Sequence, residues 1–122
     1  MATGQTKPTI IVIDADAFEA TYASSMLEDL GVNIVSYAEA DQAIQTILRD
    51  TTIRAAIIGS LPNPSRVISN LSIRRLPYLL LLPANSNRKL FGNGVSVLAK
   101  PFAAYQVADW VHKTLTQTTV TD

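Results

Sequence analysis

The sequence predicts an α/β fold: a doubly wound parallel sheet of five strands with helices on both faces. Two observations carry this prediction. Short runs of apolar residues, several rich in β-branched side chains, recur along the chain and are too short to form helices. Between them lie segments in which apolar residues return every three or four positions, which is typical of amphipathic helices. Strands that alternate with helices in this way form βαβ units, whose right-handed crossovers cover both faces of a parallel sheet.

The first strand is predicted over Ile10–Ile13, four β-branched residues of the kind found in strands that are covered on both faces. Two acids, Asp14 and Asp16, follow it at once, and Asp16 is well placed to cap a helix. Gly31 is the expected stop of this helix. Its predicted buried side consists of Phe18, Tyr22, Met26, Leu27 and Leu30.

The other strands are predicted near residues 33–37, 55–58, 78–82 and 95–98. A second helix begins at Asp41 and is expected to bury Ala43, Ile44, Ile47 and Leu48. A short helix is expected to run from Ser65 through Leu71, and a final helix over residues 103–115 is expected to bury Ala104, Val107, Ala108, Val111 and Leu115. Residues 85–93 are polar and leave room for about two helical turns, so the helix between the last two strands is short or missing.

The strand order is predicted to be 2-1-3-4-5, the common order for five strands in a chain of this size, with the first strand inside the sheet. The 122 residues suffice for one domain with a buried core. This domain is expected to span residues 9–116, with flexible tails over 1–8 and 117–122.

Composition and charge exclude several classes of function. The chain has 10 Lys and Arg and 10 Asp and Glu, so it lacks the overall basic field that holds nucleic acid. It has no cysteine, which excludes disulfides and thiolate metal sites, and its single histidine, His112, allows no histidine cluster. The longest apolar run, Tyr78–Pro83, is far too short to cross a membrane, and residues 1–8 lack the pattern of a secretory signal. A cytoplasmic location is expected.

Three features, in this order along the chain, resemble the receiver domains of response regulators, the CheY-like family. The first is the apolar strand that ends in Asp14 and Asp16, and the second is Pro77 followed by an apolar strand. The third is the segment over residues 97–102, which is similar to the lysine-proline motif that precedes the last helix of the family. The resemblance covers roughly Thr9–Leu115 and implies the flavodoxin-like form of the fold.

The resemblance also implies where the chemistry of an active receiver would lie. Such a domain accepts a phosphoryl group on an aspartate at the end of its third strand. Acids after the first strand hold Mg²⁺, which requires several oxygen ligands. A serine or threonine ends the fourth strand, and a lysine at the end of the fifth places its positive charge on the phosphoryl oxygens.

This sequence departs from the family pattern at most of these positions. Gly59, or Ser60 with a shift of one residue, occupies the phosphoacceptor position, and neither has a carboxylate. Ala15 stands where the second acid of the pair is usually found. Pro83 occupies the switch position, where a proline can neither donate a hydrogen bond nor reorient as a hydroxyl residue does.

The residues that remain of the receiver pocket are Asp14, Asp16, Lys100 and Pro101. One or two acids give little support to a Mg²⁺ site, so no metal is expected. Asp14 and Lys100 are expected to form a salt bridge across the strand ends, with a residual phosphate or metal site as the alternative. Asp16 is expected to cap a helix rather than bind a ligand. The Lys100–Pro101 peptide is expected to be cis, as it usually is in the family.

The sequence is interpreted as a pseudo-receiver of two-component (phosphorelay) signal transduction, which acts by protein–protein interaction without phosphorylation. It would serve in a hybrid histidine kinase or as an atypical response regulator, with no enzymatic activity and no cofactor. The expected partner is a signalling protein such as a histidine kinase, with no direct contact to nucleic acid or membrane, and a homodimer is left open. Tyr105 and Trp110 on the final helix are the candidate interface.

Two alternative functions remain at this stage. The first is a working receiver that is phosphorylated, with Mg²⁺, on a displaced acid such as Asp14 or Asp16. The second is a flavodoxin-like small-molecule binder or enzyme that shares only the fold with receivers.

Overall fold

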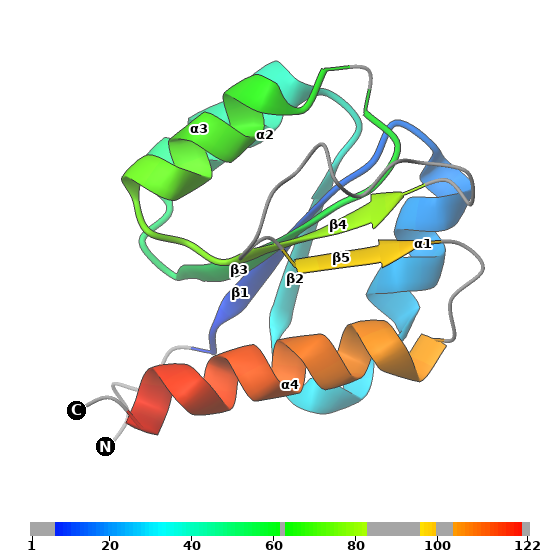
Figure 1. Cartoon of the computed structure of the whole chain (residues 1–122), viewed down its shortest axis with the longest axis vertical. Helices are drawn as coiled ribbons and strands as arrows, with labels where there is room; N and C mark the ends of the chain where they lie inside the picture. Colours follow the sequence, from blue (N-terminus) through cyan, green and yellow to red (C-terminus); the bar gives the residue numbers. More distant parts are fainter. Residues whose placement is uncertain (1–6, 62, 83–95, 100–103, 121–122) are drawn as a thin grey trace.

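The computed structural model of the chain describes residues 7–61, 63–82, 96–99 and 104–120. Five parallel strands form one sheet in the order β2-β1-β3-β4-β5, and helices cover both of its faces (Figure 1). The predicted flavodoxin-like fold class and strand order are confirmed. The segment predicted to hold a short or missing helix, residues 85–93, lies outside the described residues.

The sheet and its helices alternate along the chain. The strands are β1 (Thr9–Ile13), β2 (Asn33–Tyr37), β3 (Ile53–Ile58), β4 (Tyr78–Leu82) and β5 (Ser96–Ala99). The helices are α1 (Ala17–Ser25), α2 (Ala40–Arg49), α3 (Ser65–Ile73) and α4 (Ala104–Val120), and a 3₁₀ turn, η2 (Glu28–Leu30), follows α1. No helix within the described ranges is long and apolar enough to span a membrane.

The pairing of β1 with β3 contains one irregularity. Thr9 lies opposite Ile53, but the next residue, Ile10, lies opposite Ala55. Arg54 is passed over, and it is the one exposed residue of β3. An extra residue of this kind is a β-bulge, and it shifts every later pair of the two strands by one position.

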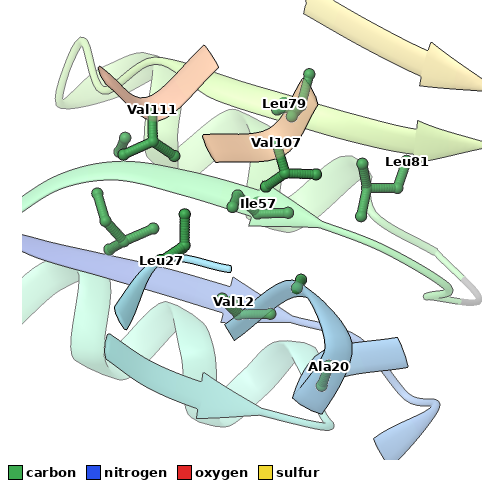
Figure 2. Packing of buried hydrophobic residues seen from close by; sticks show 11 residues of the cluster. Val12, Ala20, Leu27, Ile57, Leu79, Leu81, Val107 and Val111 are labelled. Carbon is green, nitrogen blue, oxygen red and sulfur yellow. The ribbon is translucent and has the colours of Figure 1, made fainter. Parts of the chain in front are cut away.

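The core consists of two layers, one on each face of the sheet, because successive side chains of a strand point to opposite faces. Helices α1 and α4 cover one face, where Figure 2 shows Val107 of α4 packed in one cluster with Ile57 and Leu79. Helices α2 and α3 cover the other face. Both faces of β1, and of β3 beyond Arg54, are therefore buried, which explains the continuous apolar runs in these strands, whereas the edge strand β2 is partly exposed. In β1, Ile10 and Val12 face the first layer, and Ile11 and Ile13 face the second.

The predicted buried side of the first helix is wrong in part. Phe18 is 82% exposed and Tyr22 is 43% exposed, whereas Ala20 and Ala23 are buried, together with Leu27 beyond the end of α1. Both sets of residues have helical spacing, so the period alone could not decide which set faces the sheet. The helix turns its alanines inward, because small side chains allow its backbone to lie close to the strands.

The prediction for the second helix needs one smaller correction. Ala43, Ile44 and Ile47 of α2 are buried as predicted, but Leu48 is 58% exposed. Residues on a helix are separated by about 100°, so Leu48 points well away from Ile47 and lies at the flank of the buried side.

The last helix is longer than predicted. It extends over Ala104–Val120, whereas the sequence pattern suggested an end at Leu115. Val107 and Val111 are fully buried, as expected. No Gly or Pro occurs over residues 116–120 to stop the helix, so residues 117–120, expected to belong to a tail, are helical.

Candidate functional site

The candidate site lies where β1 and β3 end side by side, at the carboxyl edge of the sheet that is the usual place for ligands in this architecture. Ile13 lies opposite Ile58, and the N–H of Gly59 donates a hydrogen bond to the carbonyl of Ile13 at 2.8 Å. The N–H of Asp14 donates to the carbonyl of Tyr37 in β2 at 3.0 Å. These bonds continue the parallel pairing past the ends of the strands and bring Gly59 beside Asp14.

The Asp14 side chain fills the space over Gly59. Asp14 is 2% exposed, and its Oδ1 accepts a hydrogen bond from the N–H of Asp16 at 2.8 Å. A Cβ atom built on Gly59 would lie 2.5 Å from the carboxyl carbon of Asp14 and closer still to Oδ2. Carbon atoms in contact are normally about 3.5–4.0 Å apart. Asp14 therefore occupies the volume that a side chain at residue 59 would need.

Two further hydrogen bonds join the loop after β3 to the loop after β1 and to the start of α1. The N–H of Ala15 donates to the carbonyl of Ser60 at 2.7 Å. The Ser60 hydroxyl donates to Oε2 of Glu19, in the first turn of α1, at 3.0 Å. The two loops therefore hold each other in place, and the hydroxyl of Ser60 is engaged by the helix.

Asp16 caps α1, which confirms the prediction of a helix cap. Its Oδ1 accepts hydrogen bonds from the N–H groups of Phe18 at 2.9 Å and Glu19 at 3.3 Å. These two donors belong to the first turn, where N–H groups have no partner within the helix. The two acids that follow β1 thus have different roles: Asp14 lies over Gly59, and Asp16 holds the start of the helix.

The described acids do not gather into a metal site. Within residues 7–61, 63–82, 96–99 and 104–120, no three or more His, Cys, Asp or Glu side chains are grouped so that they could hold a metal ion.

Three residues of the predicted pocket lie outside the described residues. They are the switch-position residue Pro83, the lysine Lys100 and its neighbour Pro101. The salt bridge between Asp14 and Lys100 and the cis peptide therefore remain predictions.

The candidate interface on the last helix is described in part. Tyr105 lies in the first turn of α4, and its side chain is outside the described residues. Trp110 is half-buried and packs against the core cluster between the sheet, α1 and α4. Trp110 therefore contributes to the core with part of its side chain.

Sequence reasoning missed the exposed face of α1. Phe18 and Tyr22 lie one turn apart on this face, and the exposed Thr21 and Ser25 lie beside them. The Thr21 hydroxyl donates to the carbonyl of Ala17 at 2.9 Å, and the Ser25 hydroxyl donates to that of Tyr22 at 2.8 Å. Both hydroxyls are thus satisfied within the helix. The signal in the sequence was the near absence of charge: α1 has one charged residue, a glutamate, in nine.

A groove beside β2 does not resemble a small-molecule site. It has a volume of about 590 Å³ and is lined by Tyr37, Gln42, Gln45, Thr46, Arg49 and Asp50. Ligand pockets are usually enclosed and mostly apolar, with a few polar groups. Here almost every lining side chain is polar, so the groove gives no support to the small-molecule alternative.

Comparisons with known proteins identify the fold. No family model and no curated protein matches the sequence. A response regulator receiver domain from Clostridium thermocellum matches with a TM-score of 0.79 and 14% identity, over 93% of this chain and 98% of that chain. A response regulator receiver protein from Sinorhizobium medicae matches with a TM-score of 0.76 and 20% identity, over 90% and 95% of the two chains.

A third similar structure is the receiver domain of a sensor histidine kinase from Pseudomonas aeruginosa, with a TM-score of 0.76 and 20% identity over 91% of this chain and 99% of that one. The crystal structure of that domain has a magnesium ion coordinated in its active site cleft. Identities this low establish a shared architecture, and the architecture is that of response regulator receiver domains.

Proposed function

We propose that this chain is a receiver-like domain that acts without phosphorylation, as a protein-interaction module of two-component signal transduction. The observation that carries the proposal is Gly59 beside the buried Asp14 at the end of β3, where an active receiver has its acceptor aspartate. Glycine has no carboxylate that could form an acyl phosphate. The proposal includes the absence of enzymatic activity and of a resident cofactor.

Phosphorylation of a displaced acid is the main alternative, and the geometry disfavours both candidates. Asp14 is 2% exposed, so its oxygens offer little access for a phosphoryl donor. Asp16 is exposed, but phosphorylation there would place a bulky group where Oδ1 accepts the N–H groups of Phe18 and Glu19. Either reaction would therefore disturb the contacts that hold the loop after β1.

Intact mass spectrometry after incubation with acetyl phosphate and Mg²⁺ tests the proposal. We expect no phosphoryl adduct on this chain, whereas an active receiver treated in parallel gains one. A hydroxylamine-sensitive adduct that is lost in Asp14→Asn or in Asp16→Asn would contradict the proposal and identify the displaced acceptor.

We place the partner contact on the exposed face of α1. Phe18 and Tyr22 present apolar surface there, and the hydroxyls beside them are already bonded within the helix. Aromatic side chains are enriched in protein interfaces, and tyrosine is among the residues that most often contribute a large share of the binding energy. We propose that an apolar surface of a histidine kinase or of another signalling protein covers this face.

Binding measurements against a panel of purified histidine kinases from the same organism test the placement. Phe18→Ser and Tyr22→Ser are expected to weaken the interaction about tenfold or more each, as for central aromatic residues of interfaces. Ile73→Ser is the matched control, because Ile73 is 77% exposed but lies on α3, over the opposite face of the sheet. An equal loss in all three variants, or a loss confined to Tyr105→Ala and Trp110→Ala, would place the contact elsewhere.

A further inference from the structure

The Cβ position of Gly59 is crowded, while its backbone conformation is open to other residues. Among the described residues, Gly31 is the one glycine with a positive φ, 69°, and a Cβ there would meet nothing within 4 Å. The φ of Gly59 is not positive, so a residue with a side chain could adopt its backbone. A glycine at such a position marks a site where another group approaches closely. That group is the Asp14 carboxylate.

Asp14 has little freedom to leave this position. Its N–H is bonded to the carbonyl of Tyr37, so its backbone belongs to the sheet. Its Oδ1 is bonded to the N–H of Asp16, and rotation of the side chain away from Gly59 would break that bond. The neighbouring loops are also joined, through the bond between Ala15 and Ser60. A side chain at residue 59 would therefore have to displace a carboxylate that is held in place.

We infer that Asp14 and Gly59 form a sterically matched pair, in which the carboxylate of β1 occupies the space of an acceptor side chain on β3. The chain thereby closes its own strand-end site. The steric pairing is a property of the fold. Its consequence for signalling, a site that stays in one state, rests on the proposed function. One consequence is that restoring an acid at residue 59 does not restore an acceptor unless Asp14 is changed too.

A double-mutant cycle on the full chain tests the pairing. The four proteins are wild type, Asp14→Ala, Gly59→Ala and the double variant, and unfolding in urea is followed by the fluorescence of Trp110. Gly59→Ala is expected to raise the unfolding equilibrium constant about tenfold or more in the wild-type background, as when a group is forced into a filled core site. In the Asp14→Ala background the same substitution is expected to change the constant by less than about twofold.

Two further variants separate volume from other effects. Asp14→Asn retains the volume of the side chain and removes its charge, so the cost of Gly59→Ala is expected to persist in that background. Gly31→Ala is the matched glycine control, because its cost comes from the positive φ and is expected to be equal with and without Asp14.

Each outcome decides the pairing independently of phosphorylation. If Gly59→Ala does not fold, a folded Asp14→Ala/Gly59→Ala protein supports the pair, and an unfolded double variant beside a folded Asp14→Ala protein overturns it. An equal cost of Gly59→Ala in both backgrounds, or no cost in either, also overturns it. Phosphorylation of the wild-type chain by acetyl phosphate would refute the proposed function and leave the result of the cycle unchanged.

Discussion

Two aspartates with the same local geometry lie at opposite ends of the sheet. Asp14 follows β1, and its Oδ1 accepts the N–H two residues on, that of Asp16, at 2.8 Å. Asp50 precedes β3, and its Oδ1 accepts the N–H of Thr52, again two residues on and again at 2.8 Å. Each closes an Asx turn.

The two turns differ in what surrounds the carboxylate. Asp14 is buried and lies over Gly59, so its shape has to fit its neighbour. Asp50 is half-buried, and the Thr52 hydroxyl adds a hydrogen bond at 2.5 Å. The Asx turn of Asp14 thus fills space beside the C-terminal end of β3, whereas the Asx turn of Asp50 stabilises a carboxylate before its N-terminal end. Substitutions near Asp14 should act through volume, and those near Asp50 should act through hydrogen bonds and charge.

The largest expected effect comes from adding volume beside Asp14, and added volume beside Asp50 provides the comparison. Gly59→Val forces a branched side chain into the space of the Asp14 carboxylate and is expected to lower the free energy of unfolding by about 3 kcal/mol or more. Thr51→Ile, which also adds volume but at an exposed position beside Asp50, is expected to alter it by less than about 0.5 kcal/mol. Urea unfolding of both variants measures the difference. Similar losses of unfolding free energy in the two variants would show that added volume has the same effect at both turns.

An intermediate effect is expected from Arg74, which lies beside the Asp50 turn. Its guanidinium donates hydrogen bonds to the carbonyls of Ile47 and Asp50, at the end of α2. A cation at a helix C-terminus also interacts favourably with the helix dipole, so Arg74→Ala is expected to lower the free energy of unfolding by about 1–2 kcal/mol.

Arg75→Ala is the matched control for Arg74→Ala. Arg75 is the exposed neighbour, and its φ of 57° is equally unfavourable for alanine, so little change in unfolding free energy is expected. A loss as large as that of Arg74→Ala would indicate a general effect of removing charge at the end of α3.

The smallest expected effect is that of Asp50 ionisation on the free energy of unfolding at acid pH. The hydroxyl and the N–H of Thr52 lower the pKa of this carboxyl below its ordinary value; burial opposes them, and Arg74 assists. The unfolded chain therefore binds a proton more readily than the folded one, so Asp50 stabilises the fold above its unfolded pKa of about 3.9. This contribution is lost as the pH falls through the lower folded pKa.

Urea unfolding across this acid range, on wild type and Asp50→Asn, measures the contribution. The two curves are expected to converge as the pH falls, because protonated Asp50 loses its advantage over asparagine. The effect is small because the side chain is only half-buried, so solvent still screens its charge. Curves that stay parallel through the acid range would show that Asp50 does not titrate differently in the two states.

The parts of this molecule that could be predicted from the sequence depend on local chemistry. The continuous apolar run of Ile10–Ile13 indicates a strand covered on both faces, and the structure buries it between two layers of helices. Asp16 could be predicted as a cap because the donors it satisfies are two and three residues away.

The parts that could not be predicted depend on tertiary contacts. Spacing indicates that Phe18 and Tyr22 share one side of a helix, but it cannot show whether that side or the alanine side faces the sheet. The contact between Asp14 and Gly59 joins residues from different strands, so the choice between Gly59 and Ser60 depended on a register that no local pattern encodes. A glycine at the end of an apolar run is a general turn signal, whereas the space beside Gly59 is filled by a residue that follows another strand.

The bulge at Arg54 determines which residue of β3 reaches the strand-end site. A regular pairing from Thr9 and Ile53 onward, with Arg54 opposite Ile10, would bring the bulky Ile58 beside Asp14 in place of a glycine. The extra residue moves each later pair by one position, and Gly59 arrives there instead. Loss of Arg54 itself would remove the bulge and keep these later pairs, so among natural variants of this chain a one-codon deletion should be tolerated better at Arg54 than at its buried neighbours in β3.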